Sequence, residues 1–252
     1  MNSIFTYHKI TDRLDFGICT RKIDDFKHDI SWISSLPHNE RPRIIFDDGY
    51  EDTFHTAFPI LEKAGLTATI YVIGGMIGKL NTWDADFLGN FRHINDTELK
   101  SLFKAGWKIG SHGFSHRALT ALSSERVKEE LKKSKDELEQ LLGIKVNEIS
   151  FPFGNFNQRV LELTKEAGFE SAISISRSSS DGFVKRSLAV YRTDTINHLI
   201  KKAAGIPQEL IRLRMINAFS ELTVWMHRLE DFRDRFKHPK KIQNIIRNDR
   251  RE

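Results

Sequence analysis

Three short stretches of this 252-residue chain hold side chains that could bind a metal and move protons. The first is the pair Asp47-Asp48, which follows the apolar run 44–46 and precedes Gly49. Two neighbouring carboxylates at the end of a strand repel each other unless a cation neutralises one of them. The pair therefore predicts one metal ligand and one general base. On its own, an Asp-Asp-Gly sequence also fits a solvent-exposed turn.

The second stretch holds two histidines four positions apart, His112 and His116, with Gly113 between them. Two imidazoles at this spacing can share a divalent metal on a helix. Here the strand-like residues before His112 and the glycine after it favour a strand that ends in a loop. Together with Asp48, the histidines leave coordination positions open for water and substrate, which is typical of a catalytic metal site. The alternative interpretation is two unrelated surface histidines.

The third stretch is an aromatic turn at 151–154. Pro152 and Gly154 restrict its backbone, and the N–H of Phe153 in such a turn can face a developing oxyanion. The same residues also fit an ordinary turn with no chemical role.

The elements that must position these residues follow a repeated order. Three segments read as an amphipathic helix that ends in Ala-Gly and is followed by a β-rich strand, and the glycine suits the left-handed cap of a helix. The expected strands lie at 4–7, 43–46, 67–73, 107–111, 146–151 and 170–175. Repeated β-α units predict a parallel sheet, and six or seven of them favour a closed or distorted barrel. In such a fold the chemistry lies at the carboxyl ends of the strands, where all three stretches fall.

In this combination and order, the three stretches resemble the motifs of the polysaccharide deacetylase family. The resemblance spans roughly residues 1 to 195. It implies an α/β fold, a distorted (β/α)7-type barrel. It also implies hydrolysis of an acetyl group, most readily an N-acetyl group, from a sugar in glycan biosynthesis.

The resemblance also implies a role for each motif residue. Asp47 is then the general base. Asp48, His112 and His116 hold a divalent metal, for which zinc is expected, and the amide of Phe153 completes the oxyanion hole.

The chain departs from the family pattern in three places. Gly113 stands where Ser or Thr is usual, Ser150 stands where an Arg usually tethers the base, and the late motif that supplies the general acid is absent. Similar family members carry an Arg in the stretch 181–188, so we expect Arg186 to replace the tether. A branch with permuted motif order begins with Tyr-His, so we expect His8 to protonate the leaving amine.

Aromatic side chains are expected to form the floor of a sugar site, although each also suits a core position. The candidates are Phe114, Phe156 and Trp83, with Phe153 and Trp107 as further choices.

Two other functions fit parts of the pattern. A metal-dependent phosphoesterase could use the same ligands, but its phosphate would need a loop such as Gly74-Gly75, which lacks the Lys-Ser/Thr of a P-loop. A catalytically impaired glycan-binding module could explain the missing tether, but the proposed base and all three ligands are present.

Composition and charge set the organisation of the chain. The single cysteine, Cys19, excludes an intramolecular disulfide framework. Most of the net charge of +5 lies in the tail at 237–252, which holds six basic and two acidic residues. No nucleic-acid-binding face is therefore expected on the rest of the chain. We expect a catalytic barrel at 1–204, an amphipathic helical extension at 205–236 and a disordered basic tail at 237–252.

The N-terminus does not read as a signal peptide and no apolar run has the length of a membrane span, so we expect a cytoplasmic protein. The apolar stripe from Ile211 to Phe236 could pack on the barrel, pair in a homodimer or lie on the inner membrane face. Arg212, Arg214 and the basic tail favour contact with anionic lipid, in which case the acetylated sugar would be lipid-linked.

Overall fold

A parallel β-barrel forms the centre of the computed structural model, which describes residues 3–13, 15, 17–81 and 91–216. The sheet has eight strands in the order β10-β1-β4-β5-β6-β7-β8-β9. Their bounds are β1 (Ile4–Tyr7), β4 (Arg43–Phe46), β5 (Thr69–Val72), β6 (Lys108–Ser111), β7 (Glu148–Ser150), β8 (Ser171–Ser174), β9 (Val184–Arg186) and β10 (Leu188–Ala189). The predicted parallel barrel is therefore confirmed.

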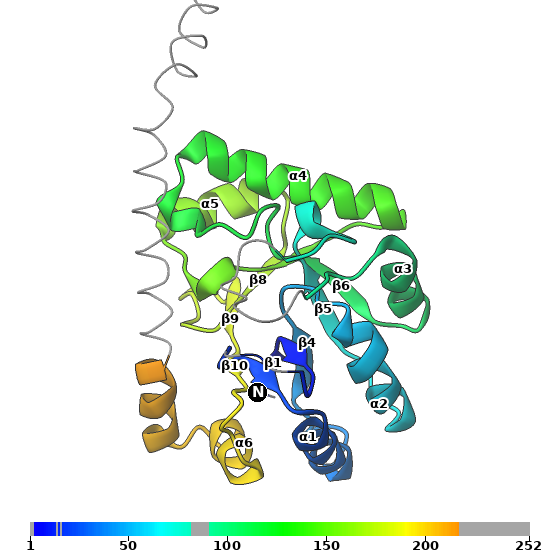
Figure 1. Ribbon diagram of the computed structural model, residues 1–252. Coiled ribbons are helices and arrows are strands. Elements are labelled where there is room, and N and C mark those ends of the chain that lie inside the picture. Colours follow the sequence, from blue (N-terminus) through cyan, green and yellow to red (C-terminus); the bar gives the residue numbers. More distant parts are fainter. Residues whose placement is uncertain (1–2, 14, 16, 82–90, 217–252) are drawn as a thin grey trace, which may run out of the picture.

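Helices surround the strands, with α4 and α5 on one side of the barrel and α1 and α6 on the opposite side (Figure 1). The helices are α1 (Ile23–Ser35), α2 (Phe58–Lys63), α3 (Asp96–Lys104), α4 (Ser124–Leu142), α5 (Gln158–Glu166) and α6 (Ile196–Ala203). Short helical turns are η1 (Thr53–Ala57), η2 (Gly74–Met76), η3 (Leu119–Ala121) and η4 (Pro152–Gly154), and β2 (Lys9–Ile10) pairs with β3 (Thr20–Arg21).

One segment closes the barrel. β9 and β10 are the two edges of the sheet, yet only Ser187 separates them along the chain. The N–H of Ser187 donates to the carbonyl of Ser174 in β8 (2.9 Å), and its hydroxyl accepts a hydrogen bond from Thr6 in β1 (2.7 Å). The stretch 184–189 therefore divides into two edge strands, because it contacts both ends of the sheet.

Strand alternation separates an inner from an outer set of side chains. Ile4, Ile45, Tyr71 and Ile173 come from four different strands and form their own apolar cluster inside the barrel. The alternate side chains, such as Phe46, belong to the main core between the sheet and the helices.

The amino ends of the strands are filled by a polar network. Arg43 donates to Glu148 (3.0 Å) and to the hydroxyl of Tyr71 (2.8 Å), which itself donates to Glu148 (2.6 Å). These groups fill the barrel interior at the amino ends of the strands. The reactive groups gather at the opposite end of the barrel, where the strands have their carboxyl ends.

The helix at 207–216 packs on the barrel. Leu213 is 1% exposed, whereas Ile211 and Met215 are 54% and 66% exposed. Arg212 pairs with Asp194 (2.8 Å) and with Glu209 (2.6 Å), so it is not available for lipid in the way the sequence suggests.

The rest of the predicted extension and the whole basic tail lie outside the described residues. Within the described ranges, no helix combines the length and the apolar character that a membrane crossing requires.

Asp194 holds this region together, because its buried carboxylate pairs with Lys202 and Arg212 and accepts a hydrogen bond from the N–H of Tyr191. Asp194→Ala should lower the free energy of unfolding by about 3–5 kcal/mol, since it leaves the buried Lys202 ammonium without its counter-ion. Urea unfolding measures this loss. Asp136→Ala, which breaks the exposed pair with Lys132, is the control, and an equal loss in both variants would contradict the prediction.

Candidate metal centre and active site

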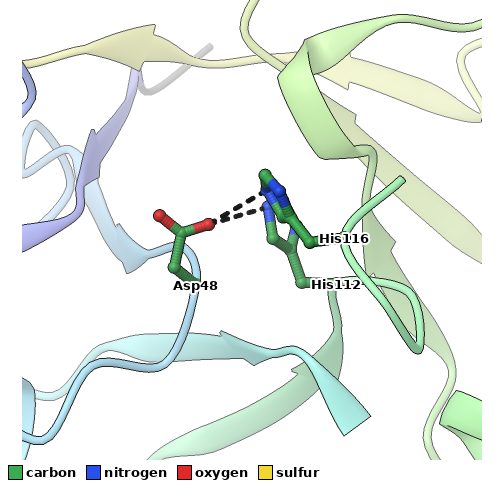
Figure 2. A group of neighbouring side chains, drawn as sticks. All are labelled: Asp48, His112 and His116. Atoms are coloured by element: carbon green, nitrogen blue, oxygen red, sulfur yellow. Dashed lines mark ion pairs between the residues drawn. The ribbon is translucent and has the colours of Figure 1, made fainter. Parts of the chain in front are cut away.

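Three buried side chains converge at the carboxyl ends of β4 and β6. The Nε2 atoms of His112 and His116 lie 3.3 Å and 3.2 Å from Oδ1 of Asp48 (Figure 2). One ligand atom from each residue falls within 4.8 Å of the other two. The structure therefore brings together the three residues that the sequence predicts as metal ligands.

The sheet fixes two of these ligands, because its hydrogen-bond ladder continues past the strand ends. The N–H of Asp47, next to Asp48, donates to the carbonyl of Tyr7 (2.9 Å), and the N–H of His112 donates to the carbonyl of Val72 (2.8 Å). Parallel strands end at one edge of a barrel, so the ligands meet although 64 positions separate Asp48 from His112 in the sequence.

The backbone of the site is strained. Among the described residues, the non-glycine residues with left-handed φ are Asp48 (71°), His116 (55°) and Phe153 (58°). Each such residue costs on the order of 1–3 kcal/mol and persists only where its surroundings hold it. All three lie in the motifs that the sequence marks as chemical, so the strain is concentrated at the site.

The surroundings shift the pKa of each of these groups. Burial opposes a charge on His112, but the carboxylates of Asp47 and Asp48 raise its pKa. Nδ1 of His112 donates to the carbonyl of Ser150 (2.8 Å), which leaves Nε2 as the ligand atom. Burial lowers the pKa of His116 to about 4, so this ring is neutral. Burial opposes ionisation of Asp48, but the two histidines beside its carboxylate hold its pKa well below the usual value. Two imidazoles and a carboxylate are a donor set that zinc accepts.

Asp47 has a different environment from its neighbour. Its Oδ2 accepts a hydrogen bond from the hydroxyl of Ser150 (3.0 Å), and its Oδ1 is buried with no hydrogen-bond partner among the described residues. Burial is the main reason that the pKa of Asp47 is raised. The serine that replaces the usual arginine thus contacts the predicted base directly.

Arg186 does not form the predicted tether. No hydrogen bond or ion pair joins it to Asp47 in the described structure. In β9 its neighbour Lys185 pairs with Ile173, an inner residue, so Arg186 faces the outside of the barrel. Burial and the charge of Arg214 lower the pKa of its guanidinium. The expectation fails because strand alternation directs this side chain away from the site.

His8 follows β1 and lies close enough to influence the site. Its charge acts on the pKa values of Asp47, Asp48 and His116. Its Nδ1 is buried and has no hydrogen-bond partner among the described residues.

The loop between the two histidines is held by a residue that the sequence analysis did not identify. Glu130 of α4 accepts hydrogen bonds from the N–H groups of Phe114 (3.0 Å) and Ser115 (2.9 Å) and from the hydroxyl of Ser115 (2.6 Å). Glu130 lies on a helix with many similar glutamates, so no local signal distinguishes it.

The Gly74-Gly75 pair holds the same loop from another side. Its N–H groups donate to the carbonyls of Gly113 (3.0 Å) and Phe114 (2.8 Å). A Cβ on Gly75 would lie 2.5 Å from the carbonyl oxygen of Phe114, so only glycine allows this approach. Because these N–H groups are already bonded, the pair is no phosphate cradle, which further weakens the phosphoesterase alternative.

The predicted sugar-stacking rings of Phe156 and Phe114 differ in how far their faces are covered. The ring of Phe156 stacks on Phe151 (5.5 Å between centroids), and the guanidinium of Arg177 lies over it at 4.8 Å. The Lys133 ammonium lies 5.8 Å from the ring centroid of Phe114. The contacts of Phe156 leave neither face open for a sugar.

Of the remaining aromatic candidates, the ring of Phe153 packs against His116 at 4.7 Å and thus belongs to the metal site. Trp107 is 2% exposed and precedes β6, at the opposite end of the strand from His112. Trp83 lies outside the described residues.

Comparison with known proteins assigns the family. Residues 40–172, more than half of the chain, match the sequence model of the polysaccharide deacetylase family, and the chain therefore belongs to it. A Bacillus subtilis protein named as a polysaccharide deacetylase is 29% identical over 130 residues, which are 52% of this chain and 43% of the relative. The poly-β-1,6-N-acetyl-D-glucosamine N-deacetylase of Staphylococcus aureus is 28% identical over 180 residues, 66% of this chain and 59% of the relative.

The chain thus spans about half the length of these curated relatives. Among solved structures, the Streptococcus pyogenes deacetylase PplD superposes with a TM-score of 0.69 at 19% identity, over 80% of this chain and 97% of that protein. A polysaccharide deacetylase from Bacillus cereus gives 0.66 at 20% identity, over 80% of this chain and 68% of the other. At these identities the likeness establishes the barrel fold.

Loss of the Glu130 hydrogen bonds to Phe114 and Ser115 should weaken metal binding. Glu130→Ala frees the loop that carries His116, and we expect a loss of about 10–100-fold in zinc affinity, as for other residues that orient metal ligands. Competition with a chromophoric chelator measures the affinity. The exposed Glu137 of the same helix provides the control variant Glu137→Ala, and equal affinities for the two variants would show that these hydrogen bonds have no such role.

Proposed function

We propose that this chain is a metal-dependent deacetylase that hydrolyses an N-acetyl group on a glycan. The observation that carries the proposal is the buried cluster of Asp48, His112 and His116 with a second carboxylate, Asp47, beside it. Membership of the polysaccharide deacetylase family supports the reaction class.

Asp48, His112 and His116 would hold a divalent ion, and we propose zinc. When bound, such an ion polarises the acetyl carbonyl and lowers the pKa of a nearby water. The burial of the ligands and the hydrogen bond that fixes the His112 ring keep the three donor atoms directed at one point.

The side chains around the metal would divide the proton transfers. Asp47 takes the proton of the attacking water, and the hydroxyl of Ser150 holds its carboxylate in place. The N–H of Phe153 donates to the oxyanion that forms on the acetyl group. His8 then protonates the departing nitrogen, so acetate and a free amine leave without a covalent enzyme intermediate.

The test of the base is Asp47→Asn. The variant should retain its metal, because Asp47 is not a ligand, and lose about 10²–10⁴ in kcat, the usual contribution of a positioned base. Acetate release from acetylated amino-sugar oligomers gives kcat, and elemental analysis gives the metal content. Asp136→Asn on the exposed face of α4 is the control. Full activity in Asp47→Asn would assign the base elsewhere.

The acid is tested by dependence on the leaving group. His8→Ala should lose activity on an amide, whose amine departs only when protonated, and lose far less on an activated aryl acetate. Parallel assays of the two substrates on wild type and variant measure the difference. Equal losses on both substrates would contradict a role as general acid.

The substrate class follows from the relatives by analogy. The Staphylococcus aureus protein is named for poly-β-1,6-N-acetyl-D-glucosamine. We propose an N-acetylated hexosamine glycan as substrate, either free or attached to a lipid. Acetate release from free β-1,6- and β-1,4-linked oligomers, from a lipid-linked sugar and from a nucleotide-linked sugar shows which of these forms the enzyme accepts.

We further propose that the end of the described chain contacts a second surface. Ile211 and Met215 are exposed apolar side chains on the helix at 207–216. These side chains would contact either an anionic membrane or a second copy of the chain. In the first case the protein is cytoplasmic and attached to the membrane surface, and in the second it is a homodimer. Co-sedimentation with anionic vesicles, compared between wild type and Ile211→Ser with Met215→Ser, tests the first, and sedimentation velocity tests the second. Behaviour unchanged by the substitutions would reject both.

A further inference from the structure

A buried histidine lies directly behind the metal ligand Asp48. His93 is 1% exposed, and its Nδ1 lies 3.0 Å from the backbone carbonyl oxygen of Asp48. Because a carbonyl only accepts hydrogen bonds, Nδ1 is the donor. The ring also stacks on Tyr50, with 4.9 Å between centroids and 18° between planes.

The hydrogen bond is made to a backbone that needs support. Asp48 and Gly49 are consecutive residues with left-handed φ values of 71° and 70°. Gly49 adopts this conformation readily, whereas Asp48 carries a Cβ that disfavours it. The conformation of Asp48 sets the direction in which its carboxylate leaves the chain, towards His112 and His116 (Figure 2).

The segment that carries His93 runs alongside this turn. The N–H of Ile94 donates to the carbonyl of Gly49 (2.8 Å), and the N–H of Glu51 donates to the carbonyl of Arg92 (2.9 Å). These backbone bonds place the His93 ring against the turn, but they do not bond the Asp48 carbonyl. Among the described residues, the His93 side chain is the donor that the structure gives to this carbonyl.

We propose that His93 is a positioning residue for the metal site: its Nδ1–H holds the carbonyl of Asp48 and thereby keeps the Asp48 carboxylate directed at the two histidines. The inference rests on the proposed metal site and adds a residue outside the sequence motifs. Orienting residues of this kind typically contribute about 10–100-fold to metal affinity.

Two substitutions separate the hydrogen bond from the ring contact. His93→Asn places an amide N–H close to the position of Nδ1 and removes the stacked ring, whereas His93→Phe keeps a ring on Tyr50 and removes the donor. Zinc and cobalt dissociation constants are measured by competition with a chromophoric chelator, and thermal unfolding of the metal-free proteins is recorded beside them.

The expected result is metal affinity close to wild type for the Asn variant and a loss of roughly 10–100-fold for the Phe variant. The absorption bands of bound cobalt, which report ligand geometry, should match wild type in His93→Asn and change in His93→Phe.

Three outcomes would overturn the inference. A Phe variant that binds as tightly as wild type shows that the donor is not needed. A folded Asn variant that binds weakly shows that the ring matters instead, and this comparison stands even if His93→Phe does not fold. A wild-type protein that binds no metal contradicts the proposed function and, with it, the inference. If the wild type binds metal and His93→Phe binds it equally tightly, only the inference is contradicted.

Discussion

The end of β4 places two carboxylates side by side in the interior, and the rest of the site compensates for their charge. Asp47 and Asp48 are 3% and 4% exposed. A buried carboxylate must be paired or hydrogen-bonded, because its charge has lost the surrounding water. The carboxylate of Asp48 lies beside two imidazoles, and that of Asp47 accepts a hydrogen bond from the hydroxyl of Ser150. The surroundings therefore hold the pKa of Asp48 down and let that of Asp47 rise, which suits the distinct roles of ligand and base that we propose for them.

The barrel holds the backbone of the site in the conformation that brings these side chains together. Its ladder continues past the strand ends and fixes the backbone at Asp47 and His112, while neighbouring elements hold the strained residues that follow. Glu130 and the Gly74-Gly75 pair restrain the loop between the two histidines, and the segment around His93 restrains the turn at Asp48. Backbone strain of this kind persists only where the surrounding contacts hold it.

The sequence predicts the parts of this structure that depend on local pattern. The helix-glycine-strand repeat gives the parallel barrel, and two motifs at strand ends give the cluster of Asp48, His112 and His116, since the ends of parallel strands share one edge. It does not predict which way a single side chain points on an edge strand, so Arg186 was expected inside and lies outside. It also does not identify Glu130 or His93, because their contacts join elements distant in the sequence and neither stands in a motif. The covered ring of Phe156 likewise depends on Arg177, which reaches it from beyond β8.

We expect Asp48, His112 and His116 together to hold one divalent ion. X-ray absorption at the zinc edge of the reconstituted protein tests it most directly, because imidazole ligands have a characteristic multiple-scattering pattern. The spectrum should show two imidazoles, with nitrogen and oxygen ligands at about 2.0–2.1 Å, and His112→Ala should lose one imidazole. A spectrum without imidazole, or one that His112→Ala leaves unchanged, would contradict it.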